Sequence, residues 1–293
     1  MFRNFLLIAQ RNLFKNKVFS LVNILGLAIG MAACWFIFEY VRFERSYDGW
    51  HANAGRIYRV PLAFTRDLTG GGVGNANYAA TGPEMKADLP EVEEFARLGD
   101  PSAFGTTGAQ QFSYTDEHRN SRRFNETEFY FADASFLRMF SFPFLEGDPH
   151  TALADGKSVV ISASMARKYF GDEDAMGKTL YFNSHPLIVE GVFQDVPGNS
   201  HVHFQLLISL PPDFGHSDQD APSWYTYILL KPGTDPSRVA AKLPAFVDKH
   251  LTKRLSPLNM GAVFFLQSLT AIHLGSSFGG GYELRALRRR FIS

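Results

Sequence analysis

Residues 18–38 have the sequence VFSLVNILGLAIGMAACWFIF, and this stretch decides how the rest of the chain is organised. It contains 21 consecutive residues without a charged side chain. At about 1.5 Å of rise per helical residue the run spans roughly 31 Å, which matches the hydrocarbon core of a bilayer. We therefore predict a transmembrane helix from Val18 to Phe38, surrounded by the lipid bilayer.

The charges on either side of this run predict its orientation. Four basic residues and no acidic residue precede it: Arg3, Arg11, Lys15 and Lys17. The fifteen residues after it hold two basic and three acidic side chains: Arg42, Arg45, Glu39, Glu44 and Asp48. Since the basic flank of a span stays on the cytoplasmic side, we expect the N-terminus in the cytoplasm and everything after Phe38 outside it.

Two other interpretations of the apolar run are open. One is a helix buried in a soluble core, although such helices are usually shorter and carry a polar stripe. The other is a cleaved signal peptide, since Ala32-Ala33-Cys34 resembles a lipoprotein processing site. The run continues for four apolar residues beyond Cys34, where a cleaved signal would turn polar, so the span is favoured. Gly26 and Gly30 form a small-xxx-small pair that would let another helix approach closely.

The residues before the span predict a short helix on the inner leaflet. Residues 2–16 place apolar side chains near one helical face and polar side chains elsewhere. We expect 1–17 to be a cytoplasmic amphipathic segment, with a flexible basic tail as the alternative.

The net charge of the chain is zero, with 29 basic and 29 acidic residues, which argues against nucleic-acid binding. This balance is a cancellation, because residues 1–38 carry +4, residues 39–268 carry −7 and residues 269–293 carry +3. The single cysteine, Cys34, excludes a disulfide framework within the chain and a multi-cysteine metal cluster. The pattern describes a mildly acidic domain held outside a membrane by one positively flanked helix.

Residues 39–268 predict one extracytoplasmic domain of mixed α+β class. Short strand patterns alternate irregularly with helices, which favours α+β over a doubly wound sheet. Strands are expected at 56–64, 128–131, 157–161, 179–182, 187–193, 203–210, 225–231 and 262–266. Helices are expected from Ser162 to Phe170 and after Asp235-Pro236, and residues 183–185 as a hairpin turn. The polar block 95–129 suggests a division of this domain into two lobes.

No pattern in the domain predicts chemistry. Gly177-Lys178-Thr179 resembles the end of a phosphate loop, but Asp172 stands where the first glycine is required. The glycine-rich stretch 70–74 does not bridge an obvious strand and helix. His201 and His203 could share one face of an extended segment, but a third metal ligand is missing. We therefore predict no catalytic residue, no cofactor and no metal site.

Several stretches together resemble ABC transporter permeases of the MacB/FtsX type. Near the N-terminus these are Ala9-Gln-Arg-Asn-Leu13, Asn23-Ile-Leu-Gly-Leu-Ala-Ile-Gly30, Glu44-Arg-Ser-Tyr-Asp48 and Arg56-Ile-Tyr-Arg-Val60. In the domain they include Phe136-Leu-Arg-Met-Phe140, Phe144-Leu-Glu-Gly-Asp-Pro149, Ser158-Val-Val-Ile-Ser162, Ala166-Arg-Lys-Tyr-Phe-Gly171, Gly177-Lys-Thr-Leu180, Val189-Glu-Gly-Val-Phe-Gln-Asp-Val-Pro-Gly-Asn-Ser200, Tyr227-Ile-Leu-Leu-Lys-Pro-Gly233 and Leu269-Thr-Ala-Ile-His-Leu274. The resemblance covers residues 1 to about 274, and its motifs are specific only as a set.

This resemblance implies a fold, a location and partners. The domain would be a MacB-like periplasmic core domain, and the protein a non-catalytic permease subunit of the bacterial inner membrane. A separate cytoplasmic ABC ATPase would supply energy for export or mechanotransmission, and it would be contacted through parts of such permeases that are missing here. The Gly26 and Gly30 face would pack against another permease helix or the partner in a homodimer.

The C-terminal residues depart from the family pattern. Permeases of this type continue into three further membrane helices, whereas residues 269–293 end the core and add a basic tail with four arginines. We interpret this tail as the result of a truncation, a frameshift or a fragment, with a solvated or lipid-binding tail as the alternative. A single-pass anchored binding or interaction module is therefore the second functional hypothesis, and a membrane-tethered hydrolase is the third.

Overall fold

The computed structural model describes residues 11, 15, 17–64, 73–74, 76–101, 108–116, 118–211, 214, 222–258 and 260–275. These residues form two compact units, one ending at Ser46 and the other beginning at Tyr47. Of the predicted amphipathic segment 1–17, only residues 11, 15 and 17 belong to the described part, and the basic tail after residue 275 lies outside it.

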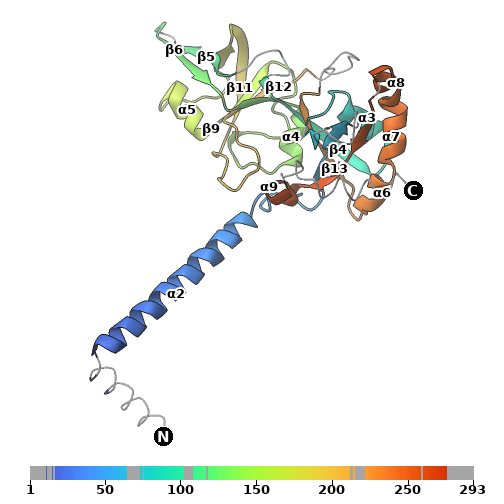
Figure 1. Ribbon diagram of the computed structural model, residues 1–293. Helices are drawn as coiled ribbons and strands as arrows, with labels where there is room; N and C mark the ends of the chain where they lie inside the picture. The colour runs from blue at the N-terminus through green and yellow to red at the C-terminus, as the bar shows by residue number, and fades with distance from the viewer. Residues whose placement is uncertain are drawn as a thin grey trace. The chain divides into compact units, whose positions relative to one another are not determined.

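The first unit contains one long helix, α2 (Lys17–Glu44) (Figure 1). Its 28 residues correspond to about 42 Å, so the helix extends beyond the predicted span of 18–38. None of its residues is buried among the described residues. Among the described residues α2 is the one helix long and apolar enough to cross a membrane.

The second unit is built on one large mixed sheet (Figure 1). Its strands follow the order β15-β1-β13-β4-β7-β12-β9-β11-β10-β5-β6, and β8 pairs with β11 beside this path. The bounds of its first six strands are β1 (Ile57–Arg59), β4 (Val92–Gly99), β5 (Gln110–Thr115), β6 (Ser121–Glu126), β7 (Phe129–Ala132) and β8 (Phe144–Gly147). The other six are β9 (Ser158–Ser162), β10 (Thr179–Phe182), β11 (His185–Phe193), β12 (Leu206–Ser209), β13 (Trp224–Leu230) and β15 (Gln267–Ser268). The β9–β11 and β7–β12 pairs are parallel and the other pairs are antiparallel, as expected for an α+β domain.

A small sheet and short helices complete the unit. The sheet has the order β14-β2-β3, with β14 (Ala262–Phe264), β2 (Leu62–Phe64) and β3 (Val73–Gly74). The helices are α3 (Thr81–Asp88), α4 (Ala134–Met139), α5 (Ala163–Phe170), α6 (Pro236–Ala240), α7 (Leu243–His250), α8 (Thr252–Leu255) and α9 (Ile272–Gly275).

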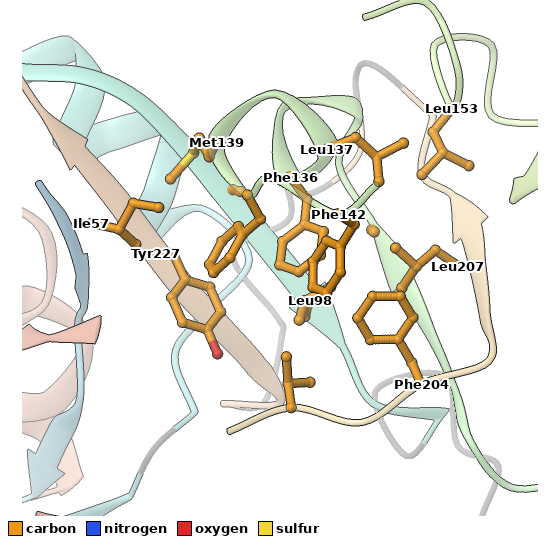
Figure 2. Packing of buried hydrophobic residues seen from close by; sticks show 14 of the residues in the cluster. Ile57, Leu98, Phe136, Leu137, Met139, Phe142, Leu153, Phe204, Leu207 and Tyr227 are labelled. Atoms are coloured by element: carbon orange, nitrogen blue, oxygen red, sulfur yellow. The ribbon is translucent and has the colours of Figure 1, made fainter. Parts of the chain in front are cut away.

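Three large hydrophobic clusters, and a small one of Ala79, Leu210 and Trp224, lie along the large sheet. The central one is rich in aromatic side chains, and Figure 2 shows Phe136, Phe142, Phe204 and Tyr227 converging between the strands and α4. A second cluster includes residues of α7 and β13, and a third packs α5 against β9, β10 and β11. One large sheet runs through the whole unit that begins at Tyr47, so the predicted two lobes share this sheet. The second and third clusters lie toward its two ends.

Local signals explain several boundaries. Ser162 caps α5 by accepting a hydrogen bond from the Met165 N–H. The Asn183 and Ser184 backbones have φ values of 45° and 72°, as a tight hairpin between β10 and β11 requires, which confirms that turn. The predicted strand 56–64 divides at Pro61 into β1 and β2, which belong to different sheets, because proline cannot donate a ladder hydrogen bond.

Two sequence expectations need correction. The helix expected after Asp235 is interrupted and becomes α6 and α7, because Pro244 occupies the first turn of α7 and has no N–H to continue the earlier helix. The polar block 95–129 contains strands β5 and β6, which the sequence pattern did not predict. They pair as a hairpin at the end of the sheet, and only Phe112 and Tyr114 of β5 alternate into the core.

Candidate functional site

A buried polar cluster lies at the start of the second unit. We call it the Asp48 cluster, and it consists of Asp48, His51, Ser200, His201 and Tyr227. These residues come from the turn after α2, from the loop between β11 and β12, and from the middle of β13. Burial of so many polar groups is costly unless they bind one another, so their partners define what the cluster can do.

Asp48 joins the turn after α2 to the loop that contains residues 199–201. Its backbone N–H donates to the Asn199 carbonyl oxygen at 3.0 Å. Its carboxylate accepts from the Ser200 hydroxyl at 3.3 Å and from the His201 N–H at 3.2 Å. The side chain is fully buried, and its φ of 55° is a left-handed conformation that Asp tolerates better than most residues. Both the backbone and the side chain of Asp48 therefore hold the same loop.

His201 continues this connection into the sheet. Its Nδ1 atom lies 2.9 Å from Asp48 Oδ1, and its Nε2 atom lies 2.8 Å from the Tyr227 hydroxyl. Tyr227 is paired with Arg59 of β1 and Ala96 of β4, so its backbone lies between two neighbouring strands. Burial raises the pKa of Tyr227, which keeps the phenol protonated. Asp48 is thus linked to the middle of the sheet through His201, whose backbone N–H binds Asp48 and whose imidazole contacts Tyr227.

His51 lies between the polar groups of the cluster and neighbouring aromatic side chains. Its Nδ1 atom accepts from the Ser141 N–H at 3.0 Å, and its Nε2 atom lies 4.0 Å from Asp48 Oδ1. The imidazole packs 3.7 Å from the Trp50 ring, measured between ring centroids. Burial lowers the pKa of His51 to about 4, against the opposing effect of Asp48. His51 is therefore neutral at neutral pH.

Tyr47, the residue before Asp48, takes part in an aromatic stack. The Tyr47 ring is parallel to the His273 imidazole, with 3.4 Å between ring centroids and 3° between planes. His273 belongs to α9, the last described helix. The first and last described segments of the second unit therefore lie side by side.

The structure separates His201 from His203. The His201 side chain is buried against Asp48, whereas His203 is exposed and lines a cleft on the surface. Residues 201–205 form a bend before β12, so the two imidazoles do not share the face of an extended strand. Among the described residues, no group of three His, Cys, Asp or Glu side chains is arranged to hold a metal ion.

The cleft beside His203 has a volume of about 270 Å³. Its residues are Glu128, Ser162, Ser164, Asp195, Val196, His203, Phe204 and Gln205. Ser164 donates its hydroxyl to Asp195 at 2.6 Å, and Asp195 also accepts the Ser164 N–H in the first turn of α5. Hydrogen bonds from Ser164 lower the pKa of Asp195 despite the opposing desolvation. The Ser164–Asp195 pair is therefore accounted for as a helix cap rather than as an activated nucleophile.

The phosphate-loop resemblance has a structural explanation. Gly177 has a φ of 72°, and its N–H bonds the Val189 carbonyl in the turn that leads into β10. Lys178 pairs with Glu173 and lies over the Phe170 ring, so its ammonium group is already bound to a carboxylate. Of the glycine-rich stretch 70–74, only residues 73 and 74 are described, and they form β3.

The predicted membrane residues all lie on α2. Val18 and Phe38 are exposed near the two ends of the apolar run. A methyl group added at Gly26 or Gly30 would meet nothing within 4 Å among the described residues.

The sequence did not predict the Asp48 cluster. Asp48 and Ser200 are the last residues of two of the family stretches quoted above. The charged Asp48 within a family motif is the signal that could have indicated the cluster.

The fold defines a class of protein: a mixed α+β domain that follows one candidate membrane helix among the described residues. The model of the MacB-like periplasmic core domain family matches residues 20–246. The chain therefore belongs to this family of ABC-type permease domains, as its sequence motifs predicted. Comparison with curated proteins gives no match.

Three solved structures are similar to this chain, and the first of them has the same fold. A domain described as a permease from Porphyromonas gingivalis aligns with a TM-score of 0.60 at 21% identity, covering 74% of this chain and 91% of that one. The periplasmic region of MacB from Actinobacillus actinomycetemcomitans aligns with a TM-score of 0.49 at 13% identity, covering 78% and 95%. The extracellular domain of the ABC-type transporter YknZ from Gram-positive bacteria gives a TM-score of 0.41 at 12% identity, covering 71% and 99%.

Proposed function

We propose that this chain is a permease subunit, or the remnant of one, in an ABC-type export or mechanotransmission complex. The observation that carries this proposal is that the match to the MacB-like periplasmic core domain family, residues 20–246, includes most of a helix of membrane length and continues through the α+β unit that follows it. In this proposal the chain is non-catalytic, and a separate cytoplasmic ATPase supplies the energy.

The same proposal places the N-terminus in the cytoplasm and the domain in the periplasm, with α2 in the inner membrane. The charge distribution around residues 18–38 supports this orientation. Protease added to spheroplasts should digest the domain after Phe38 and leave an N-terminal tag intact. Protection of the domain would overturn the orientation.

The partner ATPase can be tested directly. A tagged full-length chain, expressed in its native host and purified in mild detergent, should retain an ABC ATPase through the paired permease of the complex, as identified by mass spectrometry. Recovery of the chain with an extracytoplasmic protein and without any ATPase would instead support the second hypothesis, a single-pass anchored interaction module.

Pairing of two copies through α2 has a simple test. Cys34 follows Gly30 by four residues, and Gly30 follows Gly26 by four, so the three lie on one helical face. Mild oxidation of native membranes should therefore form a disulfide between the Cys34 residues of two copies if this face is the dimer contact. A Gly30→Ile variant should lose the cross-link, because the larger side chain keeps the helices apart. Cross-linking that persists in this variant would contradict the proposed contact.

A further inference from the structure

Asp48 is the first buried attachment of the chain after α2. The helix ends at Glu44, and only residues 45–47 separate it from Asp48. Four Cα–Cα steps join Glu44 to Asp48, so this connection reaches about 14 Å at most when fully extended. A displacement of the helix end that exceeds this short reach must therefore act on Asp48.

The contacts of Asp48 are suited to carry such a load. Its backbone N–H and its carboxylate both bind residues 199–201, and the carboxylate is buried and charged. Hydrogen bonds to a charged group are stronger than neutral ones. From this loop, His201 contacts the Tyr227 hydroxyl and thereby reaches β13, which pairs with β1 and β4.

We infer that Asp48 is a positioning residue through which a pull on the chain at residue 47 is transferred to β13 and the large sheet. The inference rests on the proposed function, because a permease of this kind needs its membrane helix and its periplasmic domain to move together. The route runs from Asp48 through Ser200 and His201 to Tyr227.

A second attachment of the same turn lies a few residues after Asp48. His51 and Ala52 are held by hydrogen bonds with Ser141. If Asp48 is released, residues 45–50 become the connecting segment, which adds three residues and up to about 10 Å of slack. A shift of α2 by one helical turn, about 5.4 Å, would be absorbed by this slack. The second attachment alone would therefore respond to a movement of α2 only after this added slack had been taken up.

The best variant for a test is Asp48→Asn. Asparagine adopts the left-handed conformation as readily as aspartate, so the turn at φ 55° is kept while the charge is lost. Alanine would add backbone strain and confuse the result. Ser200→Ala removes a single donor to Asp48 and provides a milder second variant. Asp133→Asn is the matched control, because Asp133 pairs with the buried Arg97 elsewhere in the domain.

The experiment is a single-molecule pulling measurement on the full chain in nanodiscs. In a Cys34→Ser background, cysteines replace the exposed residues Arg45 and Lys231, which follow α2 and β13 respectively, and the handles are attached there. The unsubstituted cluster should hold until the domain unfolds cooperatively. Asp48→Asn should show an extra extension of up to about 10 Å at lower force, and Ser200→Ala the same step at intermediate force.

The control decides the interpretation. Asp133→Asn should lower the unfolding force without producing the early step. An early step in Asp133→Asn, or no early step in both Asp48→Asn and Ser200→Ala, would overturn the inference. The outcome is separate from that of the proposed function: an ATPase that co-purifies with a chain lacking the early step refutes only the role of Asp48, whereas an early step without an ATPase refutes only the permease assignment.

Discussion

Two aspartates, the buried Asp48 and the half-buried Asp133, stabilise the domain in different ways. Asp133 receives the guanidinium of Arg97 at 2.7 Å, and Arg97 also donates to the carbonyl oxygens of Ala79 and Phe214. Asp48 has no such arginine, and it binds a loop backbone, a hydroxyl and a histidine. Arg97 and Asp133 lie at the junction of β4 and β7, whereas Asp48 lies at the start of the domain.

The two aspartates therefore have different roles: one stabilises the whole domain, and the other attaches its first turn to the sheet. A paired Arg97 and Asp133 hold two adjacent parts of one packed sheet together, so their loss weakens the whole domain. The Asp48 contacts hold a terminal turn against the sheet, so their loss should release that turn before the rest of the domain unfolds. Four changes test this distinction, in order of decreasing expected effect.

Asp133→Asn should have the largest effect on stability. It leaves the Arg97 guanidinium, whose side chain is 3% exposed, without its carboxylate partner. Removing one member of a buried ion pair typically costs about 3–5 kcal/mol. Chemical unfolding of the full chain in detergent should show this loss at neutral pH. A loss below about 1 kcal/mol would contradict the assignment of this pair as the stabilising one.

Acid should weaken the Asp48 cluster through His51. Its pKa falls from 6.5 to about 4 on folding, so between these values the unfolded chain binds more protons than the folded one. The stability that this difference provides is present above pH 6.5 and is lost as the pH falls toward 4, by about 3 kcal/mol. His51→Gln should reduce this pH dependence when the free energy of unfolding is measured from pH 7 to pH 4. An unchanged slope in this variant would contradict the buried neutral state of His51.

Tyr47→Ala should have a smaller effect. It removes the stack on His273, and such aromatic pairs contribute about 0.5–1.5 kcal/mol beyond the area that they bury. The free energy of unfolding should fall by about 1 kcal/mol, and hydrogen exchange in α9 should increase. Tyr181→Ala, which changes an exposed tyrosine of β10, is the control. Equal effects of the two substitutions would show that the stack does not tie the two segments.

His203→Ala should have the smallest effect. Its side chain is exposed and lies apart from the Asp48 cluster, so the free energy of unfolding should change by less than about 0.5 kcal/mol. Metal content measured by mass spectrometry should also be unchanged. Loss of stoichiometric zinc would show that the two histidines form a metal site after all.

The sequence predicted the features that depend on local patterns. The run from Val18 to Phe38, the Ser162 cap and the turn at Asn183 each follow from composition or from backbone preferences of a few neighbouring residues. The family motifs added the overall fold. Strands β5 and β6 were missed because their outward side chains are polar and only alternate residues of β5 reach the core.

The Asp48 cluster could not be predicted from local patterns. Asp48 and His201 are 153 residues apart in the chain, and Tyr227 adds a third segment. Tertiary folding brings these segments together, and a single sequence contains no spacing rule for such contacts. For the same reason His201 and His203 were considered as a pair, although folding buries one and exposes the other.

Hydrogen exchange of the full chain in nanodiscs tests the central claim most directly. Asp48→Asn should increase exchange in residues 45–50 and 199–203 while β4 and β7 remain protected, because only the attachment of the first turn is lost. Asp133→Asn should increase exchange throughout the sheet. If Asp48→Asn increased exchange in β4 and β7 as strongly as Asp133→Asn does, Asp48 would be an ordinary stabilising residue and not the attachment between the membrane helix and the sheet.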